Sequence, residues 1–335
     1  MIEWLALADT QKREVLNLAS RQTGLPIFAI EKDWWVTLTL KAIFSTKWGR
    51  DIVFKGGTSL SKSWRLIERF SEDIDLALDR KVLGFEQTML AKNQVDKLRK
   101  AASQFISTEF KEGLISALDN LGVGSNLYNI SVVETNGTDV DPRILELHYT
   151  SVLEPDDYMR GRVLIEIGAR SLREPCSEKI ITSIIEETFP GRPFSGSPFG
   201  VQTVEPRRTF LEKIFLLHEE FSKPENKMRH ERLSRHLYDI ERLMDTINGK
   251  AALQDIQLYH TIIEHRKRIT PIRGIDYANH APNKINFIPP VIVIDRWKKD
   301  YADMHTMIYG ETLPFESLID RMHELLNRLR ALGKE

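Results

Sequence analysis

Cysteine is nearly absent from this chain: Cys176 is the only one among 335 residues, so no internal disulfide can form. No Cys/His cluster has zinc spacing, and a structural zinc site is not expected. No apolar run approaches the ~18 residues of a membrane span. The opening MIEWLALADTQKREV lacks the charged-then-apolar layout of a secretory signal. These absences predict a cytoplasmic location.

An excess of either charge is also lacking. The 47 Lys and Arg residues balance the 48 Asp and Glu residues, for a formal net charge of −1. No overall field therefore draws the chain to nucleic acid or to an anionic membrane, and any such contact must come from a local patch. With 41% hydrophobic and 28% charged residues, the composition is that of a globular protein long enough for two medium domains.

Strand-like and helix-like patterns mix over the first 200 residues, and helical patterns dominate after a Pro-, Gly- and Ser-rich loop at 189–200. We therefore expect an α/β fold in the α+β sense. A small mixed sheet with N-terminal helices occupies residues 1–205, and a helical domain occupies 206–335. Helices are predicted at 9–24, 26–44, 207–221, 231–247, 253–268 and 315–332, with a long polar helical stretch at 86–120, and strands at 51–54, 73–78, 127–133, 144–150 and 163–169.

One stretch, FKGGTSLSKSWRLIERFSEDIDLALD, combines two signals. The glycine pair after a strand lets the backbone approach a phosphate, and Thr58 and Ser59 open a helix whose free amides attract an anion. On the following strand, Asp73 and Asp75 point to one face with alpha carbons about 6.7 Å apart. Two carboxylates at ~4 Å repel by roughly 4 kcal/mol near a surface, so the pair needs a cation, a shared proton or full solvation.

Each signal alone has a plain structural explanation, a tight turn or an exposed strand face. Together they supply the phosphate cradle and the metal-holding carboxylates that nucleotidyl transfer needs. In GRVLIEIGARS, Glu166 faces away from the apolar row of its strand and is a candidate third acid; a solvent-facing glutamate explains the same pattern.

The stretch resembles the signature of the polymerase-beta-like nucleotidyltransferase superfamily, and FKGGTSLSK…RFSEDIDL resembles the AbiEii/AbiGii-type nucleotidyltransferase toxin family. Four further blocks match in order: IEKDWWV, IEIGARSLREP, TFLEKIFLLHEE and RHLYDIERL. The interval from Gly57 to Asp73 is longer than the generic superfamily pattern, and we attribute the extra length to a longer helix between turn and strand.

The resemblance implies a role for each matching residue. Gly56, Gly57, Thr58 and Ser59 would bind the phosphates of an NTP; Asp73 and Asp75, with Glu166 as third acid, would hold Mg²⁺ or Mn²⁺; Lys213 and Asp239 would complete the family's two later motifs. Lys213 would contact phosphate, and Asp239 would aid the acceptor hydroxyl or orient Lys213. The active site is expected between the two domains.

Both later residues have simpler explanations. Lys213 borders an apolar helical stripe and can lay its stem over the core. Asp239 can form a surface pair with Arg235 that contributes only ~0.3–0.5 kcal/mol. His218 lies inside an apolar arc and is expected to be a core histidine.

Two local basic runs remain, KMRHERLSR and HRKRITPIR. Such runs are usually solvated helix faces, but an enzyme acting on RNA needs phosphate contacts of this kind. The runs contribute Lys227, Arg229, Arg232 and Arg235, and Arg266, Lys267, Arg268 and Arg273. The first run is favoured because it leads into the helix of Asp239.

The function expected is Mg²⁺-dependent nucleotide transfer from an NTP to a macromolecular acceptor by a toxin of a toxin–antitoxin or phage-defence pair. A tRNA is the leading acceptor, with a protein hydroxyl second, and a cognate antitoxin is the expected partner. The alternatives are a small-molecule nucleotidyltransferase of the antibiotic-modifying kind and a non-catalytic NTP-binding module.

Overall fold

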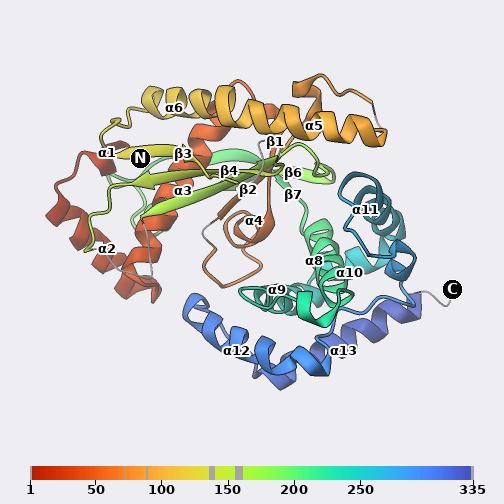
Figure 1. Ribbon diagram of the computed structural model, residues 1–335. Coiled ribbons are helices and arrows are strands. Elements are labelled where there is room, and N and C mark those ends of the chain that lie inside the picture. The colour runs from red at the N-terminus through yellow and green to blue at the C-terminus, as the bar shows by residue number, and fades with distance from the viewer. Residues whose placement is uncertain (1, 72, 88–89, 136–139, 155–160, 333–335) are drawn as a thin grey trace. The chain divides into compact units, whose positions relative to one another are not determined.

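The chain groups into two compact units in a computed structural model that describes residues 2–71, 73–87, 90–135, 140–154 and 161–332 (Figure 1). The first unit contains Met1–Trp64 and Phe70–Val204, and the second contains Arg65–Arg69 and Glu205–Glu335. Strands and helices mix in the first unit, whereas every regular element described in the second is helical. The α/β class with a helical C-terminal part is thus confirmed; the two-domain division at 205/206 stays a prediction.

A mixed seven-stranded sheet forms the centre of the described part of the first unit, in the order β3-β4-β5-β2-β1-β7-β6. The β2–β5 and β1–β7 pairs are parallel and the other neighbours are antiparallel. The strands are β1 (Ile52–Lys55), β2 (Asp73–Leu78), β3 (Tyr128–Val132), β4 (Arg143–Tyr149), β5 (Arg162–Gly168), β6 (Cys176–Ile181) and β7 (Phe199–Val204).

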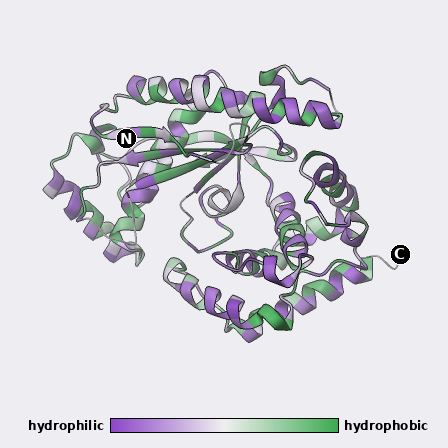
Figure 2. Ribbon diagram, viewed as in Figure 1, coloured by the Kyte–Doolittle hydropathy of each residue, from purple (hydrophilic) through white to green (hydrophobic). Residues whose placement is uncertain are grey.

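One face of this sheet is apolar because alternate residues of neighbouring strands fall in register. Ile74 lies beside Ile165, which lies beside Leu145, and all three are fully buried. They pack with helical side chains in one hydrophobic core, and Figure 2 shows hydrophobic and hydrophilic residues interspersed along the helices beside the sheet. The side chains at the intervening strand positions, among them Asp73 and Asp75, point to the opposite face.

Helices of the first unit cover the sheet and supply most of this core. In Figure 1, α5 and α6 lie along one side of the sheet and α4 on the other. α3 is buried on most sides, which suits its apolar sequence and its two tryptophans. The helices are α1 (Ile2–Leu5), α2 (Asp9–Thr23), α3 (Ile27–Ser45), α4 (Gly56–Lys62), α5 (Lys92–Phe105), α6 (Lys111–Asn120) and α7 (Ile184–Thr188).

The second unit packs its helices around a separate set of buried side chains. Phe210, Ile214 and Leu217 form the expected apolar stripe of α8 and are fully buried. The helices are α8 (Pro206–Phe221), α9 (Arg235–Met244), α10 (Ile247–Gln254), α11 (Ile256–Ile269), α12 (Ile294–Met304) and α13 (Phe315–Leu332). Among the described residues, no helix is both long enough and apolar enough to cross a bilayer.

The IEKDWWV block joins elements of the first unit through two carboxylates, of which Glu31 is buried and Asp33 is partly buried. Asp33 of α3 accepts a hydrogen bond from Lys62 at the end of α4, at 2.5 Å, and another from the backbone of Ile184 at 2.7 Å. Glu31 accepts from the Ser151 hydroxyl and the Val152 amide. The block therefore ties the C-terminal end of the helix that follows the glycine turn to α3.

Three expectations are corrected. β6, β7, α1, α7, α10 and α12 were not predicted, and β7 begins inside the run taken as loop. The helix after the glycine pair is short, ending at Lys62, so a longer helix does not explain the interval to Asp73. The interval is long because residues 65–69 belong to the second unit.

Candidate active site

The glycine turn lies directly against the Asp-x-Asp strand. Gly56 has φ +76°, a left-handed conformation that side chains disfavour, and a Cβ atom there would lie 1.9 Å from Oδ2 of Asp75. Only glycine fits, because any side chain would occupy the position of the carboxylate. The two halves of the sequence motif are therefore neighbours in space, which the sequence alone did not establish.

The hydroxyls of Thr58 and Ser59 are already engaged inside the protein. Thr58 donates to the backbone carbonyl of Asp73 at 2.5 Å, and Ser59 donates to the carbonyl of Gly56 at 2.9 Å. Both residues are buried. These bonds fasten α4 to β2, so a phosphate at this turn would be bound by backbone amides rather than by these hydroxyls. The phosphate-binding roles of residues 56–59 stay a prediction.

Three charged side chains form a row across three strands. Asp75 of β2 pairs in register with Lys55 of β1 and with Glu166 of β5. Residues in register on neighbouring strands share a face, so Asp73, Asp75 and Glu166 all lie on the face opposite the apolar core. Lys55, which the sequence analysis did not single out, places a cation on that face beside Asp75.

These carboxylates suit a metal ion that is held partly by its substrate. Among the described residues, no group of three or more His, Cys, Asp or Glu side chains is placed to hold a metal by itself. Mg²⁺ commonly uses one or two protein carboxylates and takes its other oxygens from phosphates and water. Asp73 and Asp75 fit that arrangement, and Glu166 as a third acid stays a prediction.

Lys213 and Asp239 form a buried ion pair in the second unit. Nζ of Lys213 lies 2.9 Å from Oδ2 of Asp239, and these side chains of α8 and α9 are respectively 8% and 0% exposed. Arg69 completes the cluster with a forked contact, Nε to Oδ1 at 2.7 Å and Nη2 to Oδ2 at 2.8 Å. Full burial contradicts the surface-pair explanation of Asp239, and the ion pair contradicts the view of Lys213 as a merely snorkelling side chain.

Burial and charge set the protonation of this cluster. Burial alone would raise the pKa of Asp239, but Arg69 and Lys213 outweigh it and hold that pKa below its ordinary value. Burial lowers the pKa of Lys213, against the attraction of Asp239. Burial, together with the nearby Lys213 charge, holds the pKa of His236 well below its ordinary value. The cluster therefore contains an ionised carboxylate between two cations, with a neutral histidine beside it.

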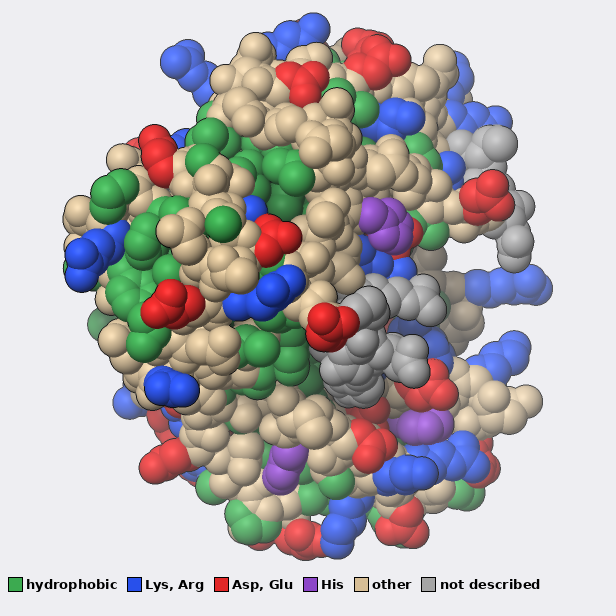
Figure 3. Space-filling model, turned by 90° about the vertical axis from the view of Figure 1, so that its left-hand side faces the viewer, with side chains coloured by type: hydrophobic (Ala, Val, Ile, Leu, Met, Phe, Trp, Pro, Cys, Tyr) green, Lys and Arg blue, Asp and Glu red, His purple; other side chains and the backbone are tan. Residues whose placement is uncertain are grey.

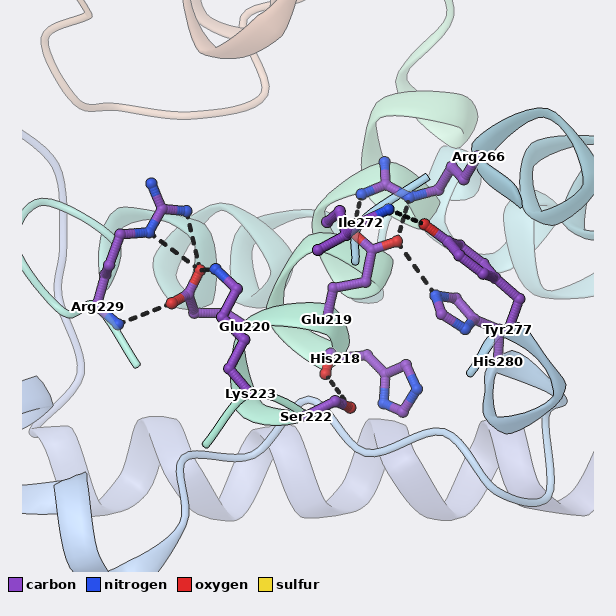
Figure 4. Close-up of polar contacts among 10 residues, drawn as sticks. All are labelled: His218, Glu219, Glu220, Ser222, Lys223, Arg229, Arg266, Ile272, Tyr277 and His280. Atoms are coloured by element: carbon purple, nitrogen blue, oxygen red, sulfur yellow. Dashed lines mark hydrogen bonds and ion pairs between the residues drawn. The ribbon is translucent and has the colours of Figure 1, made fainter. Parts of the chain in front are cut away.

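Some residues of the two basic runs form internal ion pairs, which Figure 4 shows around the end of α8. Arg266 makes a forked contact with buried Glu219, and Arg229 binds buried Glu220 through its backbone amide at 2.7 Å and its guanidinium at 2.9 Å. His218 is a core histidine as expected, 4% exposed and bonded to the backbone of Asn286. The members of the runs without an ion pair among the described residues include Lys227, Lys267 and Arg273.

Arg69 is the main site residue that the sequence analysis missed. It lies 170 positions before Asp239, and nothing in the local pattern RLIERF indicates a distant partner. Its place in the block RFSEDIDL, four residues before Asp73, was the one available signal.

The comparison with protein-family models supports the resemblance. The family model described as "Nucleotidyl transferase AbiEii toxin, Type IV TA system" matches residues 39–321. No curated protein matches. Two Helicobacter pylori structures are similar at 13% identity: JHP933, with a TM-score of 0.41 and coverage of 91% of this chain and 93% of the other, and a candidate nucleotidyltransferase, with a TM-score of 0.46 and coverage of 92% and 98%.

Replacement of Gly56 by alanine should abolish nucleotide transfer. The new methyl group would displace the Asp75 carboxylate in addition to straining the turn. Gly24→Ala is the matched control, because Gly24 has nearly the same φ, +74°, with nothing within 4 Å of its added Cβ. Gly24→Ala should cost about 1 kcal/mol of stability and keep activity. Urea unfolding and transfer assays measure both; equal activity losses in the two variants would contradict the Asp75 contact.

The buried histidine predicts a pH dependence of stability. The pKa of His236 is lowered on folding, so below pH ~6.5 the unfolded chain binds a proton that the folded chain does not. Its contribution to stability therefore falls as pH falls, by up to about 1.4 kcal/mol per pH unit. His236→Asn should flatten the loss between pH 6.5 and 5 in urea titrations, whereas His260→Asn, at an exposed histidine of α11, should not. Identical pH profiles for His236→Asn and wild type would show that His236 does not stay neutral.

Proposed function

Because this chain belongs to the AbiEii nucleotidyl transferase family of type IV toxin–antitoxin toxins, we propose that it transfers a nucleotide from an NTP to tRNA, with Mg²⁺ held at Asp73 and Asp75. The family establishes nucleotidyl transfer and the toxin class. The metal, the acceptor and the role of each residue are the proposal. A cognate antitoxin is its expected partner, and NTP and tRNA as substrates agree with the expected cytoplasmic location.

The observation that carries the proposal is the contact of Gly56 with Asp75. An Asp-x-Asp pattern alone can be explained by an exposed strand face. Here, however, the backbone of Gly56, which has no side chain, lies against the Asp75 carboxylate. A triphosphate bound along that turn would have the carboxylates beside it. Bound Mg²⁺ would supply charge neutralisation at the phosphates and hold them for in-line attack.

The chain's own residues would position the substrate and balance its charge. The amides of Gly57 and its neighbours would bind phosphate oxygens, and Asp73 and Asp75 would supply the metal ligands. Glu166 would orient water near that group, and Lys55 would offset the carboxylates in its row. Lys213, fixed by Asp239, would contribute a cation to phosphate.

Asp239 is better suited to orient Lys213 than to take a proton from the acceptor. Both of its oxygens already accept hydrogen bonds from Arg69, and one of them also forms an ion pair with Lys213. The side chain is fully buried. The lowered pKa also makes it a weak base. Of the two roles implied by the resemblance, we therefore propose the orienting one.

An RNA acceptor draws support from the cations that remain outside internal ion pairs. Lys227, Lys267 and Arg273 are exposed, and phosphate contacts from such residues position RNA without reading its sequence. Positive and negative side chains are interspersed on the one face drawn in Figure 3. With a net charge of −1 and no overall field, binding would depend on a few local contacts. A small-molecule acceptor of the antibiotic kind would instead predict an acidic or aromatic acceptor pocket.

Asp75→Ala should abolish transfer and leave the fold intact. Removing one of two neighbouring like charges should not destabilise the protein without its metal. Each of four α-³²P-labelled NTPs is incubated with total tRNA and Mg²⁺, and labelled RNA is quantified on gels, with thermal melts as the fold control. Near-normal labelling by Asp75→Ala would contradict the metal assignment. Labelled protein with unlabelled RNA would favour a protein hydroxyl.

Binding of tRNA should weaken with salt and depend on the exposed cations. Each phosphate contact contributes about 0.7–0.9 to the slope of log affinity against log salt. The double variant Lys267→Glu/Arg273→Glu should flatten the slope by about 1–2 units, and Lys227→Glu tests the other run. These sites avoid Arg266 and Arg229, whose reversal would unpair buried carboxylates.

Lys298→Glu/Lys299→Glu, which reverses two exposed charges of α12 outside both runs, is the charge-matched control. Filter binding across a salt series measures all variants. If all bind tRNA as the wild type does, the basic runs lend no support to an RNA acceptor, and a protein or small-molecule acceptor is favoured.

A further inference from the structure

The five residues Arg65–Arg69 leave the first unit and are incorporated into the second. The backbone carbonyl of Glu68 accepts hydrogen bonds from the amides of Tyr309 and Gly310, at 3.0 and 3.2 Å. The Glu68 amide donates to the Tyr238 hydroxyl at 3.3 Å, and its carboxylate pairs with Arg242 at 3.0 Å. The link between the glycine turn and the Asp-x-Asp strand is thus fastened to the helix of Asp239.

Arg69 ends this segment with a contact that fixes orientation as well as charge. Its side chain is 4% exposed, and two parallel N–H groups meet the two oxygens of Asp239. A planar guanidinium bound in this way fixes both the position and the plane of the carboxylate, which a lysine cannot do. Oδ2 of that carboxylate also contacts the ammonium of Lys213.

We propose that Arg69 is a positioning residue for nucleotidyl transfer: its forked contact sets the plane of Asp239, and Asp239 thereby sets the place of the Lys213 ammonium. This inference rests on the proposed role of Lys213 at phosphate. Arg69 does not touch the substrate. Misplacement of a catalytic group by about 1 Å can cost on the order of 100-fold in rate, so an orienting residue of this kind is needed even though the charge is supplied by Lys213.

Arg242 provides a control for simple tethering. It fastens the same segment to the same helix through Glu68, but it makes no described contact with Asp239 or Lys213. Loss of Arg242 should loosen the segment while the forked contact remains, and it should cost less stability than loss of Arg69 because the Arg242–Glu68 pair is partly exposed. A purely structural role for Arg69 therefore predicts that each substitution lowers transfer only in proportion to the stability it removes, which thermal melts measure.

The experiment compares Arg69→Lys, Arg69→Met and Arg242→Met. Arg69→Lys keeps the charge and loses the fork, so kcat for labelling tRNA should fall about 10- to 100-fold with the KM for NTP changed less than threefold. Arg242→Met should stay within threefold of wild type. Thermal melts identify variants that fail to fold, and Arg69→Lys decides the question if Arg69→Met does not fold.

A second measurement follows the titration of Lys213 directly, by NMR of isotope-labelled lysine assigned with Lys213→Met. Arg69 is a like charge that opposes protonation of Lys213. The pKa of Lys213 should therefore rise in Arg69→Met and stay nearly unchanged in Arg69→Lys, although both variants lose kcat.

Full kcat in Arg69→Lys, or an equal loss in Arg242→Met, would overturn the proposal. An unchanged Lys213 titration in folded Arg69→Met would also overturn it. If the wild type labels neither RNA nor protein with any NTP, the proposed function fails instead, while the NMR titration still reports whether Arg69 governs the Asp239–Lys213 pair.

Discussion

The cost of burying a carboxylate organises both units. A carboxylate removed from water is stable only when cations or hydrogen-bond donors surround it. Asp239 is compensated by Arg69 and Lys213, and buried Glu31 by the Ser151 hydroxyl and the Val152 amide, while partly buried Asp33 binds Lys62. Blocks that resemble the family signature, such as IEKDWWV, therefore contain residues that form internal ion pairs. Some residues of these blocks stabilise the fold rather than take part in the chemistry.

The same constraint limits which cations are available to a nucleic acid. Glu219 and Glu220 lie at the end of α8, where burial would raise their pKa values, but Arg266 and Arg229 outweigh it and hold both values low. An arginine held in this way is committed to the fold. The number of basic residues in a run thus overstates the positive charge available at the surface. The exposed cations that remain are few and separated along the chain.

Local patterns predicted the fold well where a single segment decides the outcome. The αL glycine at 24 ends α2, and alternation along DIDLAL placed Asp73 and Asp75 on one face of their strand. Alternation along VLIEIGA placed Glu166 opposite an apolar row, but the β2–β5 register that brings it beside Asp75 came from the structure. β6 and β7 were not predicted because their residues lie around Pro, Gly and Ser runs, and their pairing with each other and of β7 with β1 joins segments distant in the sequence. Arg69 was not predicted because its partner, the buried Asp239, lies in a helix far along the chain, and local patterns do not indicate such a partner.

The threading of residues 65–69 through the second unit has a consequence for fragments. A single cut at the Val204/Glu205 boundary does not release a complete helical unit, because Arg69 and the carbonyl of Glu68 would stay with the other piece. A fragment starting at Glu205 would bury Asp239 against Lys213 alone and leave the amides of Tyr309 and Gly310 without their acceptor. The helical part is thus a discontinuous element of the chain, and truncation at the apparent sequence boundary would remove part of its interior.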